Sequence, residues 1–323
     1  KINNKRKYII LFVTISSISL YSNLFMKFPD YLKITKQEKN AIISKLIDEL
    51  NNEQFNGKFV TYNNIKSSQG YVNWSENVYN DIFKINNNFK SDFRILASLH
   101  YQIPSLNFYN SYITPILYSF KKGLISNNVK NERSKIVFDL VNHKILDLLG
   151  VKFIIDKNNI EDQYIKKIGS IQNDGVEINL YEIINFSPFK NPDSVIKSEN
   201  IEETNTLLKS YKFDPINDVI VNKIFINNFN IDFKKITDFK FKISNNSIFT
   251  DGISKSPSII ILPYQFSNCF VSKNKNQLIP ANGGLLGIIY KDKIEDEIYF
   301  KQSFFNNFDC VLKDFFLFKK IRN

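Results

Sequence analysis

The sequence predicts an α+β protein with an N-terminal transmembrane helix, a mixed α/β lobe and a C-terminal antiparallel, jelly-roll-like β-sandwich. Three observations predict this fold class. An uncharged apolar run opens the chain, helix and strand patterns alternate up to about residue 221, and short strand patterns alone follow. We therefore expect residues 1–27 to be the membrane helix with its basic flank, 28–200 the mixed lobe and 201–323 the sandwich.

The N-terminal run, Tyr8–Phe25, holds eighteen residues without a charge. At ~1.5 Å per residue, a helix of this length covers most of a ~30 Å hydrocarbon core. Basic residues crowd its N-terminal side, so the positive-inside rule keeps that end cytoplasmic. We expect a bacterial cell-membrane protein whose residues after about 27 are exported, periplasmic or extracellular. A cleaved signal peptide is the alternative, although no small-residue cleavage site follows the run.

One face of this helix carries Ser16, Ser19 and Asn23. A polar stripe gains nothing from facing lipid, whereas small and polar residues suit contacts between membrane helices. We therefore expect two partners for this segment: the lipid bilayer and upstream membrane helices of the same protein.

The formal net charge of +11 raises nucleic acid as a partner, but the pattern of the charge argues against it. The lysines are scattered, and no arginine-rich stripe, zinc-ligand spacing or RNA-binding aromatic motif occurs. We expect no nucleic acid, no cofactor and no metal. Cys269 and Cys310 leave two possibilities open, a disulfide in an oxidising exterior or two small buried hydrophobic residues.

Periodicity gives the elements of the mixed lobe in order. Apolar residues at helical spacing alternate with short apolar or alternating runs, and Gly150 stands where a helix should end. The predicted helices are Lys36–Leu50, Ser75–Phe83 and Ser134–Leu149, and the predicted strands are Phe59–Tyr62, Asp92–Ser98, Val151–Asp156 and Val176–Ile184.

The rest of the chain begins with a short helix and a strand and then reads as strands alone, with no helix expected between residues 224 and 316. The aromatic segment Phe304–Phe318 is too short to span a membrane but is suited to lie on its surface. The predicted elements are the helix Ile201–Leu208 and the strands Asp218–Val221, Lys235–Ile243, Ser258–Leu262, Phe266–Val271, Gln277–Ile279, Gly287–Tyr290 and Glu297–Phe300.

The loop His100–Thr114 is the most function-like segment by composition. Aromatic rings stack on sugar rings, and amide groups both donate to and accept from hydroxyls. A preceding arginine can bind a phosphate or carboxylate bidentately. An ordinary loop of an Asn- and Tyr-rich protein is the alternative. The predicted substrate-binding residues are Arg94, His100, Tyr101, Asn107, Tyr109 and Asn110.

Two blocks, Leu148–Asp156 and Leu180–Phe189, resemble the region that follows the membrane helices in YfhO-like bacterial proteins. This chain keeps Tyr181, Glu182 and Pro188 of that pattern. It departs from the pattern where Phe189 replaces the expected arginine, and an expected tryptophan is missing near residues 267–269. The resemblance extends by order of motifs over about residues 90–300.

YfhO-like proteins are multi-spanning proteins of the GT-C glycosyltransferase type. The resemblance implies a membrane enzyme of the cell envelope that transfers sugar from a lipid-linked donor to a glycan acceptor outside the cytoplasm. It places the catalytic acid in an early exported loop, so no catalytic residue is assigned in this chain, which would hold the acceptor. The alternative is a non-catalytic, membrane-anchored binding or assembly module of the envelope.

Overall fold

The computed structural model gives a mixed, β-rich protein with several antiparallel pairings, so the α+β class is confirmed at this level. Residues 40–323 form one compact unit. The structure describes residues 41–50, 55–62, 103–106, 114, 116, 124, 140–156, 158–173, 176–226, 233–244, 247–254, 257–290, 294–301 and 306–322.

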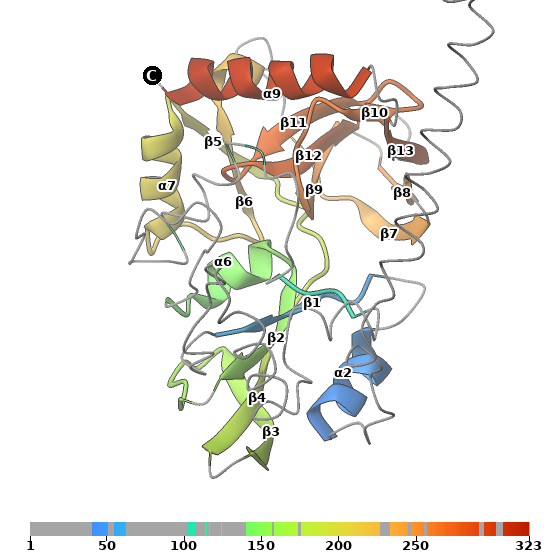
Figure 1. Ribbon diagram of the computed structural model, residues 1–323. Coiled ribbons are helices and arrows are strands. Elements are labelled where there is room, and N and C mark those ends of the chain that lie inside the picture. The colour runs from blue at the N-terminus through green and yellow to red at the C-terminus, as the bar shows by residue number, and fades with distance from the viewer. Residues whose placement is uncertain are drawn as a thin grey trace, which may run out of the picture. The chain divides into compact units, whose positions relative to one another are not determined.

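Figure 1 shows the helices and strands by label. The helices are α2 (Ala41–Leu50), α6 (His143–Leu148), α7 (Ile201–Lys209), α8 (Lys223–Ile226) and α9 (Asn306–Arg322). The strands are β1 (Lys58–Thr61), β2 (Val151–Asp156), β3 (Ile165–Asn173), β4 (Val176–Ile183), β5 (Ser194–Ser198), β6 (Asp218–Asn222), β7 (Thr237–Ser244), β8 (Ser247–Ile253), β9 (Ser258–Gln265), β10 (Phe270–Ser272), β11 (Gln277–Ala281), β12 (Leu285–Tyr290) and β13 (Asp296–Phe300).

The first sheet has the order β1-β2-β4-β3. Its β1–β2 pair is parallel, and the other two pairs are antiparallel. The sequence VKFIID makes β2 central because it is apolar on both faces. One face meets α2, where Ile42 and Leu46 pack in one cluster with Phe153 and Ile155. The amphipathic pattern of α2 is therefore explained by its cover over this sheet.

Two further sheets follow, with the orders β10-β13-β8-β7 and β5-β6-β11-β12-β9. Phe241 and Ile248 of the former share a hydrophobic cluster with Ile260 and Ile288 of the latter. The alternate residues of β9 and β12 enter a second cluster together with α6 and β6. The five-stranded sheet is thus buried on both faces, which explains its continuous apolar runs SIIIL and LLGII.

The helix predicted at Ser134–Leu149 is not continuous, which corrects the prediction, and residues 134–139 of it lie outside the described residues. Asn142 has an extended backbone, and its side-chain oxygen accepts from the amide of Ile145, so α6 begins at His143. Residues 140–142 are not helical. Gly150 ends the helix with φ of +77°, where a Cβ would lie 2.6 Å from the Cβ of Pro263. Its lack of a side chain allows the α6–β2 turn to approach β9.

The helices α8 and α9 also correct a prediction, because no helix was expected between residues 224 and 316. Aromatic residues on several sides of α9 hide its helical period. The remaining strand predictions from Phe59 to Phe300 that fall on described residues are confirmed within a few residues at their ends, apart from Phe266–Val271, of which only the end is strand. β3, β5 and β8 were not predicted.

The predicted division at residues 200 and 201 falls between β5 and β6, which pair in parallel in one sheet. The predicted elements Tyr8–Phe25, Ser75–Phe83 and Asp92–Ser98 lie outside the described residues. Among the helices that the structure does describe, none combines the length and the apolar character needed to cross a bilayer.

Candidate functional site: a pocket at the first sheet

The loop predicted to bind substrate is described only at residues 103–106 and 114. Its described part runs beside β1, where the amide of Phe59 donates to the carbonyl of Pro104 at 3.0 Å and the amide of Leu106 donates to the carbonyl of Phe59 at 2.8 Å. The predicted binding residues, Arg94, His100, Tyr101, Asn107, Tyr109 and Asn110, all lie outside the described residues, so this site stays a prediction.

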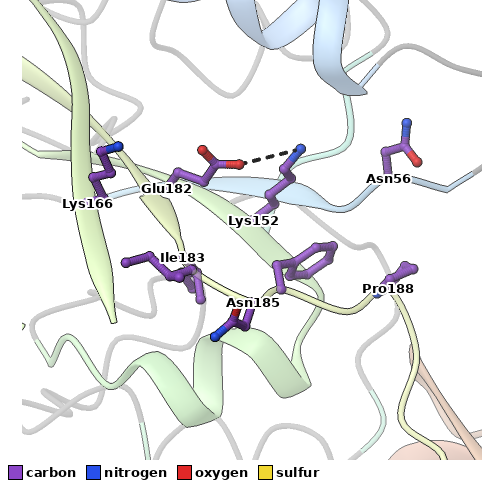
Figure 2. A pocket seen from close by; sticks show the side chains of 9 residues that line it. Asn56, Lys152, Lys166, Glu182, Ile183, Asn185 and Pro188 are labelled. Carbon is purple, nitrogen blue, oxygen red and sulfur yellow. Dashed lines mark ion pairs between the residues drawn. The ribbon is translucent and has the colours of Figure 1, made fainter. Parts of the chain in front are cut away.

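A pocket of about 650 Å³ lies at the first sheet (Figure 2). Three separate parts of the chain build it: the residues before β1, the paired strands β2, β3 and β4, and the turn after β4. Its chemistry is mixed, with two lysines, one carboxylate, two amides and one aromatic ring. The residues lining it are Asn56, Lys152, Lys166, Glu182, Ile183, Ile184, Asn185, Phe186 and Pro188.

The charged side chains of the pocket come from neighbouring strands. The Nζ atom of Lys152 lies 3.6 Å from Glu182 Oε1 and 3.0 Å from Oε2 of Glu49, so this lysine is shared by two acids. Lys166 lies opposite Glu182 in the β3–β4 register and is exposed. No carboxylate in the described part of the chain forms an ion pair with Lys166. This lysine therefore has its charge available for an anion.

A glycine makes the approach of the pocket wall possible. Gly57 has φ of +112°, and a Cβ there would lie 2.9 Å from both Lys152 Cβ and Phe186 Cζ. Any other residue would push these two side chains away from the backbone. The amide side chain of Asn56, the preceding residue, is therefore brought beside the strand that carries Lys152.

The turn after β4 forms the opposite wall, and a buried ion pair fastens it. Asn185 supplies the left-handed turn with φ of 60°. Lys190 Nζ donates to Asp147 Oδ1 at 2.8 Å and to the carbonyl of Ser187 at 2.9 Å. The side chain of Lys190 is 4% exposed and that of Asp147 12% exposed. Backbone bonds between Lys190 and Ile261 continue the attachment to β9.

Burial of this pair shifts both of its pKa values against the charged forms. Desolvation raises the pKa of Asp147, although the charge of Lys190 and hydrogen bonds from Lys190 and Ser187 oppose the rise. Desolvation likewise lowers the pKa of Lys190, against the attraction of Asp147. The attachment of the pocket wall to α6 is therefore electrostatic and is formed at a desolvation cost.

The side chain of His143 interacts with two neighbouring side chains. Its Nδ1 lies 2.7 Å from Asp162 Oδ2, and its ring centroid lies 4.3 Å from that of Tyr164. Asp214 is a turn residue, because its carboxylate accepts from the amide of Ile216 and from the side chain of Asn217. Within the described ranges, no three His, Cys, Asp or Glu side chains gather as a metal site requires.

No family model, curated protein or solved structure matches this chain. The fold and the pocket therefore carry the functional argument. Sequence patterns did not find the pocket, since its members are separated along the chain and each is ordinary in its own segment. The signal that came nearest was the resemblance, which singled out Glu182 and Pro188 without giving them a binding role.

Proposed function

We propose that this chain is the exported, acceptor-holding part of a glycosyltransferase-like membrane protein, and that the pocket binds a sugar or sugar phosphate of the acceptor. The observation that carries the proposal is the lining of the pocket. Lys152, Glu182, Phe186 and Pro188 come from the two blocks that resemble YfhO-like proteins, and both blocks meet at this one pocket.

The lining suits an anionic carbohydrate. Lys166 offers a positive charge to a phosphate or uronate group, and the amides of Asn56 and Asn185 can donate to and accept from hydroxyls. Phe186 offers an apolar ring of the kind that stacks on pyranoses. These are the side-chain types expected at a pocket with a few polar groups that fix orientation.

The same lining favours binding of the acceptor over catalysis of glycosyl transfer. Glu182 is the single carboxylate among the described residues that line the pocket, and it pairs with Lys152. A glycosyl-transfer site needs an acid or base free to exchange a proton with the reacting oxygen. We place such a group elsewhere in the protein, in an early exported loop.

One feature of the structure and one of the sequence support export. Cys269 and Cys310 form a disulfide, and disulfides persist in oxidising compartments outside the cytoplasm. The apolar run Tyr8–Phe25 with its basic flank supplies the membrane helix of the proposal. We further propose that the two C-terminal sheets are the layers of the jelly-roll-like sandwich, with the parallel pair β5–β6 as its departure from antiparallel order.

The experiment is a binding measurement on the full chain in detergent or nanodiscs with phosphorylated and acidic sugars, followed by saturation-transfer NMR. Phe186→Ala should weaken binding by roughly ten-fold, as the loss of one desolvated contact does, and Lys166→Ala by about two- to five-fold, because its charge is exposed. Lys240→Ala, an exposed lysine of β7, is the matched control and should bind as the wild type does.

Thermal unfolding of each variant separates binding from folding, because Phe186 also packs against Gly57. Absence of sugar binding by the wild-type chain, or equal binding by wild type and both pocket variants, would refute the pocket assignment. The predicted loop site is tested in the same way with Tyr109→Ala and Arg94→Ala. Binding without transfer in the intact protein favours the non-catalytic envelope module instead.

A further inference from the structure

The outward face of α9 combines aromatic and basic side chains. Phe315 is 44% exposed and Phe316 is 60% exposed, an unusual exposure for two adjacent phenylalanines. On an ideal helix they lie opposite the residues that bury α9. The basic side chains Lys319, Lys320 and Arg322 are exposed on or at the border of the same outer half, and the exposed Lys313 lies to one side of it.

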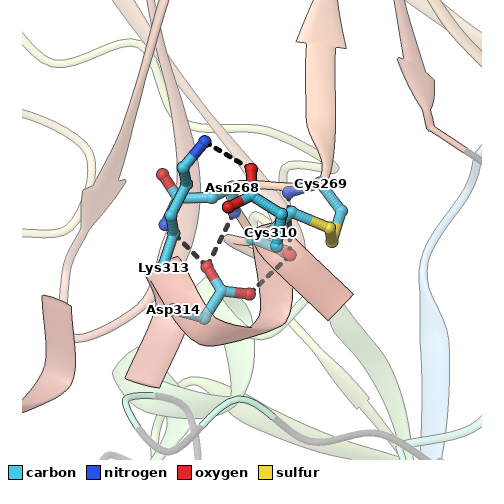
Figure 3. The surroundings of a disulfide bond; sticks show 7 residues. Asn268, Cys269, Cys310, Lys313 and Asp314 are labelled. Atoms are coloured by element: carbon cyan, nitrogen blue, oxygen red, sulfur yellow. Dashed lines mark hydrogen bonds and ion pairs between the residues drawn. A yellow bond between two sulfur atoms is a disulfide. The ribbon is translucent and has the colours of Figure 1, made fainter. Parts of the chain in front are cut away.

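The inner face of α9 holds the helix in place (Figure 3). Cys310 is bonded to Cys269, and the carboxylate of Asp314 accepts from Ser267 Oγ at 2.6 Å and from Asn268 N and Nδ2 at 2.7 Å each. Ile321 packs in a cluster with Ile201 of α7. The aromatic residues therefore cannot turn inward by rotation of the helix.

The charge on the outer face is strongly one-sided. Asp309 is the one acid in α9 besides the buried Asp314, and it pairs with Lys313 at 2.7 Å. Lys319, Lys320 and Arg322 have no acidic partner among the described residues. The Nζ atom of Lys319 lies 4.8 Å from the ring centroid of Phe315, so a charge and an apolar ring share one surface.

We propose that this face docks on an anionic phospholipid surface, with α9 lying in the plane of the interface. Phenylalanine rings enter the boundary between headgroups and acyl chains, while lysines and arginine bind lipid phosphates. A second copy of the chain suits the face less well, because an isologous contact would set the basic groups of both copies against each other.

Two aromatic residues and a few charges give weak, reversible binding by themselves. A membrane helix at Tyr8–Phe25 would keep the face close to lipid, so a weak contact would be occupied through its high effective concentration. The proposal does not depend on what the pocket binds. In this proposal, α9 sets the orientation of the exported lobe relative to the membrane surface.

The experiment uses the full chain in nanodiscs with a tryptophan reporter. The natural tryptophan is replaced by Trp74→Phe, and Phe316→Trp places a reporter on the outer face. Quenching by brominated phosphatidylglycerol should exceed that by brominated phosphatidylcholine by about two-fold or more, and salt should reduce it. Tyr211→Trp, at a site 84% exposed on another surface, is the matched control.

Adding Lys319→Glu and Lys320→Glu should bring the quenching of the Phe316→Trp chain down to the level of the control. Quenching equal to that of the control in phosphatidylglycerol overturns the proposal. So does quenching that is indifferent to lipid charge and to the lysine substitutions. Protection of the reporter that rises with protein concentration in lipid-free detergent would assign the face to a second copy and would also overturn it.

Discussion

The helices α6 and α9 are each fastened by a buried aspartate, but the two attachments differ in kind. Asp147 of α6 is held by one charged partner, Lys190, and desolvation raises its pKa. Among the described residues, Asp314 of α9 accepts hydrogen bonds from three uncharged donors of Ser267 and Asn268, with a disulfide beside it. The helix beside the pocket is thus fixed by an ion pair, and the helix of the proposed docking face by neutral donors and a covalent bond.

This difference teaches how each attachment can fail. A buried ion pair is stable only as long as both charges are present, whereas removal of both is often tolerated. A disulfide acts mainly on the unfolded chain and responds to redox conditions. The predictions below test whether the two helices differ in this way.

The largest effect is expected at Lys190. Lys190→Met leaves the buried carboxylate of Asp147 without its cation and should lower the free energy of unfolding by about 3–5 kcal/mol. The double variant Asp147→Leu/Lys190→Met removes both charges and should recover most of that loss. Urea denaturation of the three proteins measures it. A double variant as unstable as the single one would show that the pair is held by more than charge.

The next effect concerns the disulfide of α9. Replacing Cys269 and Cys310 together by serine should lower the free energy of unfolding by about 2–4 kcal/mol, because the unfolded chain is no longer cross-linked. Reduction of the wild-type protein should have the same effect and should leave the variant unchanged. If reductant lowers the stability of both proteins alike, the loss does not come from this bond.

A smaller effect is expected at the neutral donors. Asp314→Asn keeps the shape of the side chain but turns an amide donor toward Ser267 or Asn268, and should cost about 1–3 kcal/mol. Asp309→Asn, in the same helix at an exposed ion pair, is the matched control and should change stability by less than about 0.5 kcal/mol. Equal losses at the two positions would contradict the contacts described for Asp314.

The smallest effect is a dependence on pH. The folded pKa of Asp147 is raised above its ordinary value of 3.8, so the folded state binds the proton more tightly than the unfolded state. Loss of Lys190 removes an influence that lowers this pKa. The Lys190→Met protein should therefore regain stability as pH falls from neutral toward 4, by ~1.4 kcal/mol for each unit by which the pKa is raised.

The measurement is the urea midpoint of the single and double variants at a series of pH values. The double variant lacks the titrating carboxylate of Asp147. Its stability should therefore not show the increase on acidification that the single variant shows. A single variant that loses stability on acidification as fast as the double variant would mean that Asp147 stays solvated.

Sequence patterns found the strands with continuous apolar runs and missed β3, β5 and β8, whose polar residues interrupt the pattern. β2 and β9 were predicted because their runs are apolar enough to be covered on both faces. β3 and β5 lie at the ends of their sheets and carry lysine and serine toward solvent, which removes the alternation. α9 was not predicted for a related reason: phenylalanines on its outward face hide the amphipathic pattern of the helix.

The pocket could not be predicted from the sequence for a different reason. Lys166 and Glu182 become neighbours only through the β3–β4 register, and Asn56 joins them only because β1 pairs with β2. Such register is set by tertiary packing and turn geometry, neither of which a local pattern contains. The helix cap at Asn142 was readable in principle, since asparagine is a preferred N-cap residue.

The parallel pairing of β1 with β2 has a consequence for the order in which the chain folds. Lys58 contacts the carbonyl of Leu149, 91 residues further along the chain, so β1 is synthesised long before its partner strand. Loop-closure entropy makes such a pairing slow, and an apolar strand that waits for a partner is exposed to aggregation. β1 therefore stays without its partner strand until β2 has been synthesised. The wall of the pocket at Gly57 therefore cannot form before β2 has been synthesised.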